Sequence, residues 1–401
     1  MACINRSVSF EKLARFALRE SRVFYHLCLR QKRKLENLIL SKFIFPALYY
    51  PILERSQCNP PVRKEACFIF LHYKHQGGNS RLGPSQGEDY FVDTLKLMNE
   101  VKVIEYHYDV DYKKNILGDQ GLVEIVTRDH PDLIILSSYD YFSHSQPHFS
   151  VLKCIRNKLN VPIMVIWFDS NTSYAKCTLK YMLNDVDLIV SVDSDSLSKD
   201  SYNDRKFLNL WSPANTDIFK LGNNHRDIPI SFIGSTDSYR SIREEYLKFL
   251  KNNGIYVYCK TSGLQQRISL EDYAEIMRRS KISLNFSHST EGTHQLKGRV
   301  FEILFSGALL MESENNETRR FLTPMVDYVE FQSKEDLIEK VRYYLTHDVE
   351  REKIACAGHD KASKYYNPVM FWNTVDSRLK ELNLLSQTFA LSKDLKTTIL
   401  K

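Results

Sequence analysis

The chain has 401 residues, of which 43% are hydrophobic and 26% are charged, so it is long enough to form two globular domains. It has no uninterrupted stretch of ~20 apolar residues and no segment typical of a cleavable secretion signal, which argues against a spanning helix and against export. The eight cysteines form neither a CxxC pair nor a zinc-finger spacing, which favours reduced thiols in a cytosolic protein.

The net charge of +6 is distributed unevenly along the chain. Residues 1–60 contain 11 Lys and Arg against 4 Asp and Glu, whereas residues 61–401 together carry −1. A protein that binds nucleic acid along its body usually spreads cations over one face of its fold. The distribution therefore argues against a nucleic-acid partner.

The basic segment allows two interpretations. Residues 7–42 contain no Gly or Pro and mix apolar and cationic residues at helical spacing, and the aromatic run "KFIFPALYYPILE" that follows is interrupted by Pro46 and Pro51. A basic amphipathic helix with an aromatic end is typical of a peripheral contact with the inner face of a membrane, here through residues 1–55. The other interpretation is a helical extension, residues 1–60, that packs on the main body with its cations in solvent.

From Ala66 onward, short apolar runs alternate with helical patterns. The first series of predicted strands comprises residues 66–73, 100–108, 132–138, 161–169 and 187–193. The helices predicted between them comprise residues 89–99, 121–130, 149–160 and 174–186. Apolar strands that alternate with helices indicate a parallel sheet covered on both faces.

The alternation pauses at "FLNLWSPANTDIFKL" and then resumes. The second series has strands predicted at residues 228–235, 254–260, 281–287 and 328–333, and helices at residues 241–253, 269–280, 334–347 and 349–366. Ser269 is a plausible N-cap of its helix. Two such series predict an α/β protein with two doubly wound, Rossmann-type domains, which bind ligands beyond the carboxyl ends of their strands.

The order of these signals resembles that of GT-B glycosyltransferases, and more narrowly the CgeB-like branch of the family 1/4 glycosyltransferases. Four segments carry the resemblance: "VPIMVIWFDS", "LWSPANTDIF", "ISFIGSTDSYRSIREEYLKFL" and "KISLNFSHSTEGTHQLKGRVFEILFSGALLMES", the last continuing to "YVEFQSKEDLIEKVRYYL". The resemblance implies an acceptor domain, a nucleotide-sugar domain and a final helix that crosses back to the first domain. We place the acceptor domain at residues 61–221, the nucleotide-sugar domain at 222–365, and the crossover helix and tail at 366–401.

The segment "QLKGRVFEI" contains the most specific candidate site. Lys297, Gly298 and Arg299 precede a predicted helix, and cations beside free backbone N–H groups suit a diphosphate. The resemblance implies that Glu302 binds the ribose hydroxyls. In a purely structural interpretation the two cations would be solvated and Glu302 would lie in a salt bridge.

The chain differs at one position from the glycosyltransferase family that it resembles. The family has a second glutamate eight residues before the ribose-binding one, and here that position is His294, with the nearest glutamate at Glu291. The departure leaves the donor sugar and the stereochemical outcome unassigned.

Further candidates follow strands that end at the predicted cleft. Their possible roles are backbone or cation contacts with the donor (Gly234, Ser235, Arg240, His288, Gly77 and Gly78) and proton transfer (Asp169, His72 and His75). Most also have a structural explanation: a turn for the Gly77–Gly78 pair, a satisfied structural side chain for Arg240 and the histidines, and a helix N-cap for Asp169.

Other chemistries find less support in the sequence. Three Asp-x-Asp triplets occur, among them Asp193 with Asp195, but two of the three flank a buried strand as boundary residues. The spacing of His72 and His75 suits a metal, yet no third ligand stands out nearby. We therefore expect a glycosyltransferase that needs neither a metal nor another cofactor, with a nucleotide-sugar donor and a glycan or glycoconjugate acceptor. A non-catalytic nucleotide- or glycan-binding subunit and a DNA-modifying glycosyltransferase remain as alternatives.

Overall fold

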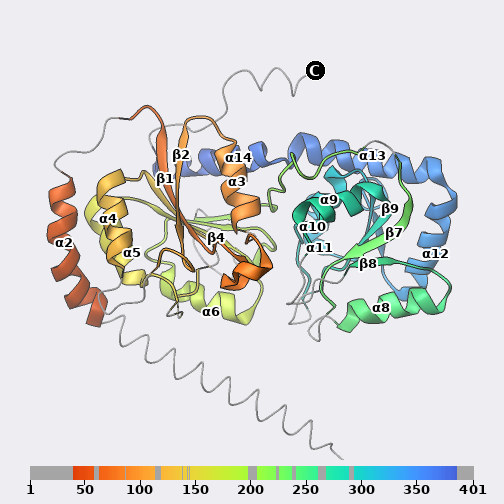
Figure 1. The fold of residues 1–401 in the computed structure, drawn as a ribbon, viewed down its shortest axis with the longest axis horizontal. Coiled ribbons are helices and arrows are strands. Elements are labelled where there is room, and N and C mark those ends of the chain that lie inside the picture. The colour runs from red at the N-terminus through yellow and green to blue at the C-terminus, as the bar shows by residue number, and fades with distance from the viewer. Residues whose placement is uncertain are drawn as a thin grey trace, which may run out of the picture.

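Two parallel β-sheets, each flanked by helices, form the body of the protein in the computed structural model (Figure 1). The structure describes residues 39–57, 63–85, 87–112, 119–137, 139–141, 143, 145–196, 206–222, 225–236, 241–260, 268–288 and 293–385. Most of the predicted extension, residues 1–38 and 58–60, lies outside this part, as do Arg240, Glu291 and the tail after Leu385.

The first sheet has six parallel strands in the order β2-β1-β3-β4-β5-β6. The strands are β1 (Ala66–His72), β2 (Val101–His107), β3 (Leu133–Ser137), β4 (Ile163–Trp167), β5 (Leu188–Ser191) and β6 (Phe207–Asn209). The helices are α2 (Phe45–Ser56), α3 (Asp93–Lys96), α4 (Gln120–Asp129), α5 (Phe149–Leu159) and α6 (Ser173–Met182), with the short π-helical segments η1 (Leu40–Ile44) and η4 (Gly87–Val92) and the 3-10 helices η2 (Gln76–Gly78) and η3 (Ser80–Leu82). All residues of β1, β3, β4 and β5 are buried, as expected for a sheet covered on both faces.

The second sheet has five parallel strands in the order β11-β10-β9-β7-β8. The strands are β7 (Ile228–Ile233), β8 (Tyr258–Lys260), β9 (Ser280–Asn285), β10 (Leu309–Ser313) and β11 (Val329–Phe331). The helices are α8 (Ser241–Asn252), α9 (Leu270–Arg279), α10 (Arg299–Phe305), α11 (Asn316–Arg319), α12 (Lys334–Thr346), α13 (Asp348–Tyr365) and α14 (Pro368–Glu381). Ser269 caps α9 as predicted, because its side chain accepts a hydrogen bond from the backbone N–H of Asp272.

The last helix joins the two halves. Helix α14 packs beside α3, where the fully buried Trp372 donates its indole N–H to Thr94 Oγ1 at 3.0 Å. The adjacent Phe371 contacts Phe91 with ring centroids 5.9 Å apart. The last helix therefore lies against the first half of the molecule.

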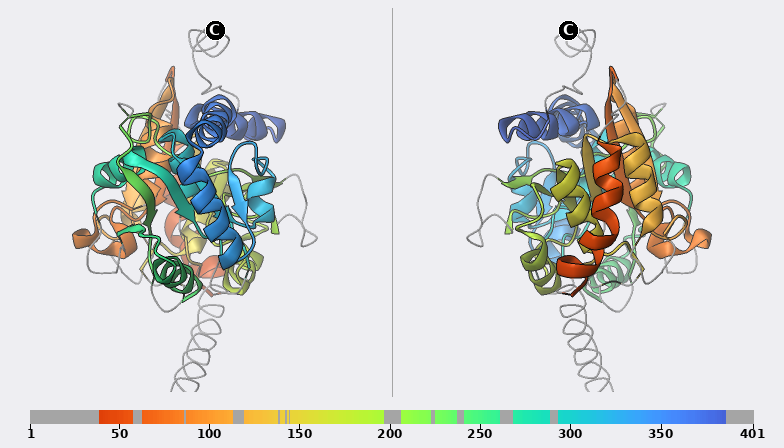
Figure 2. Two further views of the ribbon diagram at one scale, coloured as in Figure 1. Left: turned by 90° about the vertical axis from the view of Figure 1, so that its right-hand side faces the viewer. Right: turned by 90° about the vertical axis from the view of Figure 1, so that its left-hand side faces the viewer.

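Helix α2 differs from the sequence prediction, which expected an aromatic run broken by two prolines. Helix α2 follows η1 without a break, Pro46 lies in its first turn, and the helix continues through Pro51. Phe45, Tyr49 and Leu53 recur at intervals of four residues and are buried against the first domain, next to α5 and α4 (Figure 2, right). These side chains therefore belong to the protein's own core. Among the described residues, no helix combines the length and the apolar character needed to cross a membrane.

Candidate active site

A cavity of about 520 Å³ lies between the two sheets, beyond the carboxyl ends of β4, β5 and β7. The segment from Gln295 to Glu302 forms one wall of it. Its other lining residues include Gln76, Leu82, Asp89, Tyr90, Phe168, Asp169, Asp193, Gly234, Ser235, Arg243, Ser269 and Tyr273. The cavity therefore lies where ligands bind in doubly wound folds.

The carboxylate of Glu302 is buried and held by two tyrosines. Tyr273 on α9 donates its hydroxyl to Glu302 Oε2 at 2.6 Å, and Tyr90 on η4 donates to Oε1. Burial, followed by the nearby Glu302 charge, raises the pKa of both tyrosines, so both remain hydroxyl donors. Glu302 is thus satisfied by hydroxyl groups from both halves of the molecule.

Arg299 lies beside Glu302 and is held on three sides. It donates to the Tyr273 hydroxyl at 3.2 Å and to Asn285 Oδ1 at 3.1 Å, and its guanidinium lies 5.4 Å from the ring centre of Phe232. Gly234 permits this arrangement, because a Cβ at that position would lie 2.6 Å from Arg299 Nη2. The guanidinium is therefore preorganised at the cavity wall.

Lys297 belongs to a polar network that spans the cavity. It donates to Oε1 of the buried Gln295, and the Gln295 amide in turn donates to Asp169 Oδ1 at 3.0 Å and to Asp193 Oδ2 at 2.9 Å. Asn171 accepts a further bond from this amide at 2.9 Å. The network links the Lys297 ammonium through Gln295 to two carboxylates of the first domain.

Asp169 is exposed, lines the cavity and has a left-handed backbone conformation with φ of 51°. The N-cap explanation for this residue does not hold, since Thr172 caps α6 by accepting from the N–H of Ala175. Asp169 therefore presents a carboxylate to the cavity without a capping role.

Asp193 is a second carboxyl group at the cavity, which the sequence analysis treated as a strand boundary. It accepts from the N–H of Ser170 at 2.9 Å, while its Oδ1 is buried without a hydrogen-bond partner. Burial, with a smaller contribution from the charge of Asp169, raises the pKa of Asp193 to about 7. This carboxyl group can therefore hold a proton near neutral pH.

We expect Asp193 to make stability depend on pH. Its pKa is about 3.9 in an unfolded chain and about 7 in the folded one, so the folded state binds more protons between these values. The free energy of unfolding should therefore fall as pH rises from about 4 to 7, by at most about 1.4 kcal/mol per pH unit from this group. Thermal unfolding of Asp193→Asn and wild type between pH 5 and 8 measures the effect: the variant should gain stability relative to wild type as pH rises, and a constant difference would contradict the assignment.

Several predicted candidates lie outside the lining of the cavity. His72 is fully buried with Glu88 and Glu105, and His75 hydrogen-bonds Asp109 at 2.9 Å, so neither is placed to take a proton in the cavity.

His288 packs against the ring of His294 with centroids 4.4 Å apart. Gly77 and Gly78 both have positive φ and serve a turn, while the neighbouring Gln76 and Leu82 reach the cavity. Of the predicted site residues, Asp169, Gly234, Ser235, Lys297, Gly298, Arg299 and Glu302 do line it.

Sequence reasoning missed several polar residues of the cavity, among them Tyr90, Asp193, Arg243, Tyr273 and Gln295. Arg243 lies in the first turn of α8, three residues after Arg240 in the sequence, and donates to the carbonyl of Ser235 at 3.0 Å. Only Gln295 carried a local signal, since it is two residues from Lys297. The others are brought together by strand register and helix packing.

Comparison with known proteins agrees with this architecture. Residues 232–375 match the family model described as glycosyl transferase-like. This segment resembles a glycosyltransferase domain. It contains Lys297, Arg299 and Glu302. A comparison with curated proteins found no match.

Three solved structures share the two-domain fold at low sequence identity. The HepE protein of Anabaena, in complex with UDP and glucose, has a TM-score of 0.56 at 11% identity, covering 79% of this chain and 100% of that one. Sucrose-phosphate synthase of Thermosynechococcus elongatus has a TM-score of 0.54 at 10% identity, covering 80% and 98%. A glycosyltransferase of Rickettsia africae has a TM-score of 0.51 at 11% identity, covering 80% and 99%. The GT-B fold predicted from the sequence is thereby confirmed.

Proposed function

We propose that the protein transfers a sugar from a nucleoside-diphosphate donor to a hydroxyl group of a glycan or glycoconjugate. The observation that carries this proposal is the arrangement of Lys297, Arg299 and Glu302 on one wall of the cavity, with the exposed Asp169 on the first domain. Within the class, the motifs favour the CgeB-like branch. HepE, which shares the fold, was solved with UDP, so UDP is the first nucleotide to test.

The donor would bind on the second domain. The diphosphate carries negative charge that Lys297 and Arg299 offset, and Arg299 offers the planar fork that suits phosphate oxygens. Helix α10 has only seven residues and sums few peptide dipoles, so the two side chains supply most of the positive charge. With both cations in place, we propose that the leaving diphosphate needs no metal ion.

Glu302 would accept hydrogen bonds from the ribose hydroxyls. Its two oxygens already accept from the hydroxyls of Tyr90 and Tyr273, which are donors of the same chemical kind. Since Tyr90 comes from the first domain, we propose that the nucleotide takes its place and that Tyr90 moves aside on binding.

In the reaction, the bond between the anomeric carbon and the diphosphate oxygen breaks and a bond from that carbon to the acceptor oxygen forms. The acceptor hydroxyl must lose its proton, and Asp169 is the exposed carboxylate of the cavity placed to take it. A non-catalytic binding subunit would need no such group, so Asp169 favours an enzyme.

Glu302→Ala tests the ribose contact. We expect roughly 10- to 100-fold weaker binding of UDP, because a hydrogen-bonded charge is lost, and little change for inorganic diphosphate, which lacks a ribose. Isothermal titration calorimetry with both ligands measures the two effects.

The matched control is Glu275→Ala, which removes an exposed carboxylate that pairs with Arg278 on α9. Glu302→Gln keeps the side-chain volume and one acceptor should Glu302→Ala be unstable. Equal losses for UDP and inorganic diphosphate would remove the ribose role.

A further inference from the structure

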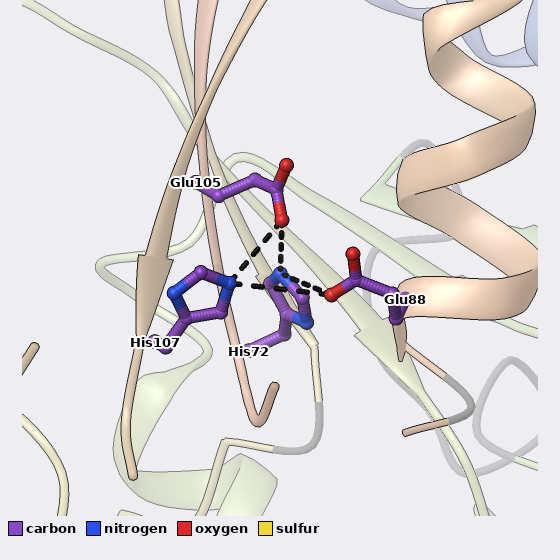
Figure 3. A group of neighbouring side chains, drawn as sticks. All are labelled: His72, Glu88, Glu105 and His107. Carbon is purple, nitrogen blue, oxygen red and sulfur yellow. Dashed lines mark hydrogen bonds and ion pairs between the residues drawn. The ribbon is translucent and has the colours of Figure 1, made fainter. Parts of the chain in front are cut away.

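Four side chains outside the cavity converge at the carboxyl ends of β1 and β2 (Figure 3). They are His72 from β1, Glu105 and His107 from β2, and Glu88 from η4. Each offers one nitrogen or oxygen atom, and these four atoms lie within 4.8 Å of one another.

The backbone explains why they converge. Strands β1 and β2 are parallel with His72 beside His107, and Glu105 lies two residues before His107 on the same face of the sheet. The turn η4 crosses this face and supplies Glu88, and the absent side chain of Gly87 leaves room for His72, whose Nδ1 would lie 3.3 Å from a Cβ there. The cluster therefore forms because of the register of β1 with β2 and because the backbone at Gly87 lies close to His72.

The distances suit a small cation. His107 Nε2 lies 3.2 Å from Glu105 Oε2 and 4.0 Å from Glu88 Oε2, and His72 Nε2 lies 3.5 and 3.8 Å from the same two oxygens. A tetrahedral ion with bonds of about 2.0–2.1 Å holds its ligand atoms about 3.3 Å apart. The four nitrogen–oxygen distances of 3.2–4.0 Å bracket this value, and no two of the four atoms are more than 4.8 Å apart, so a contraction of the cluster would bring them to that spacing.

Both histidines are oriented by bonds from their other ring nitrogen. His72 Nδ1 is 2.9 Å from the carbonyl of Tyr73, and His107 Nδ1 is 2.8 Å from Asp111 Oδ2. An acceptor at Nδ1 places the proton there and leaves a lone pair on Nε2, which is the second-sphere arrangement that metal-bound histidines use.

The centre of the cluster is incompletely satisfied. His72 is fully buried, and neither its Nε2 nor Glu88 Oε2 has a hydrogen-bond partner. Buried polar atoms without partners are rare and point to an unseen ligand. Lys96 pairs with the other oxygen of Glu105 and leaves Oε2 directed at the histidines.

We propose that His72, Glu88, Glu105 and His107 bind a divalent transition-metal ion of the zinc class. Two imidazoles and two carboxylates form a donor set that zinc, and also iron(II) or manganese(II), accepts. Four protein ligands leave no open position in a tetrahedral site, so the ion has a structural role.

The site would act on the cavity through η4. This turn carries Glu88 and, directly after it, Asp89 and Tyr90, which line the cavity. An ion that holds Glu88 against β1 and β2 would fix the segment that delivers Tyr90 to Glu302. Metal binding by these four side chains does not depend on the sugar-transfer activity, so the two are tested separately.

The test uses tag-free full-length protein, stripped of metal with a chelator and titrated with zinc chloride by calorimetry. We expect one tightly bound ion per chain, lost in His107→Gln and in Glu88→Gln. The control is His75→Gln, because His75 lies three residues from His72 and also pairs with a carboxylate, that of Asp109, but is not part of the cluster. This variant should bind zinc like the wild type. Absorption at the zinc edge should show nitrogen and oxygen ligands at about 2.0–2.1 Å and no sulfur.

If a variant of one of the four ligands fails to fold, a variant at the surface can still test whether the cluster binds zinc. Asp111 is exposed and would act on a bound ion only through His107, so Asp111→Asn should weaken zinc binding by roughly 10- to 100-fold with the fold intact. Absence of zinc binding by wild type, unchanged binding by the ligand variants and Asp111→Asn, or an equal loss in His75→Gln would overturn the proposal. Either result leaves nucleotide binding to be judged by its own titrations.

Discussion

Arg299→Ala should weaken the binding of UDP by roughly 10- to 100-fold, because the diphosphate loses a preorganised, charged hydrogen-bond donor. Asn285, Tyr273 and Phe232 hold the guanidinium in place before any ligand arrives, so little conformational entropy is spent on binding. Calorimetry gives the change in affinity directly.

Two further variants separate charge from geometry. Arg299→Lys keeps the positive charge but loses the planar fork and should recover only part of the affinity. Arg279→Ala removes an exposed arginine that pairs with Asp227 at the end of α9 and should leave UDP binding unchanged. Wild-type affinity in Arg299→Ala, with its fold verified by circular dichroism, would show that the diphosphate lies elsewhere.

Asp169→Asn should lower kcat by about 10²- to 10⁴-fold and leave the affinity for UDP unchanged, because it removes a base and keeps the shape of the side chain. Asparagine tolerates the left-handed backbone at this position, where φ is 51°, and its amide oxygen can still accept from Gln295. Release of UDP from a panel of UDP-sugars, with water or added glycans as acceptors, provides the rate.

Asp217→Asn is the matched control, since Asp217 is an exposed aspartate that does not line the cavity. It should retain the wild-type rate. A full rate in Asp169→Asn would assign proton removal to another group, and an equal loss in UDP affinity would indicate a structural role instead.

The sequence predicted most elements because strands such as β1, β3, β4 and β5 are continuous apolar runs and most helices have their own periodicity. Strand β6 was missed, since Phe207–Asn209 is too short for a recognisable pattern. Strand β10 was concealed within the apolar run that includes α10. Helix α2 was misjudged because Pro46 and Pro51 suggested a break, whereas burial of its apolar face compensates for the bond lost inside the helix.

The site was predictable where its residues are neighbours in sequence. Lys297, Arg299 and Glu302 occur within one short segment, and Asp169 directly follows a strand. All four residues line the cavity. His72 also ends a strand, but its side chain faces Glu105 and His107, and this depends on the register of β1 with β2. Periodicity indicates the edge of the sheet that a residue reaches, and not the neighbour that its side chain meets there.

The most direct test of the account is a titration of the full-length protein with nucleoside diphosphates, their sugar conjugates and free sugars, followed by thermal shift and calorimetry. We expect at least one nucleoside diphosphate to bind at a single site and raise the melting temperature, with its sugar conjugate competing for that site and a smaller shift in Arg299→Ala. If no nucleoside diphosphate binds at millimolar concentration, or if binding is the same in Arg299→Ala, the cavity between the two sheets is not a donor site.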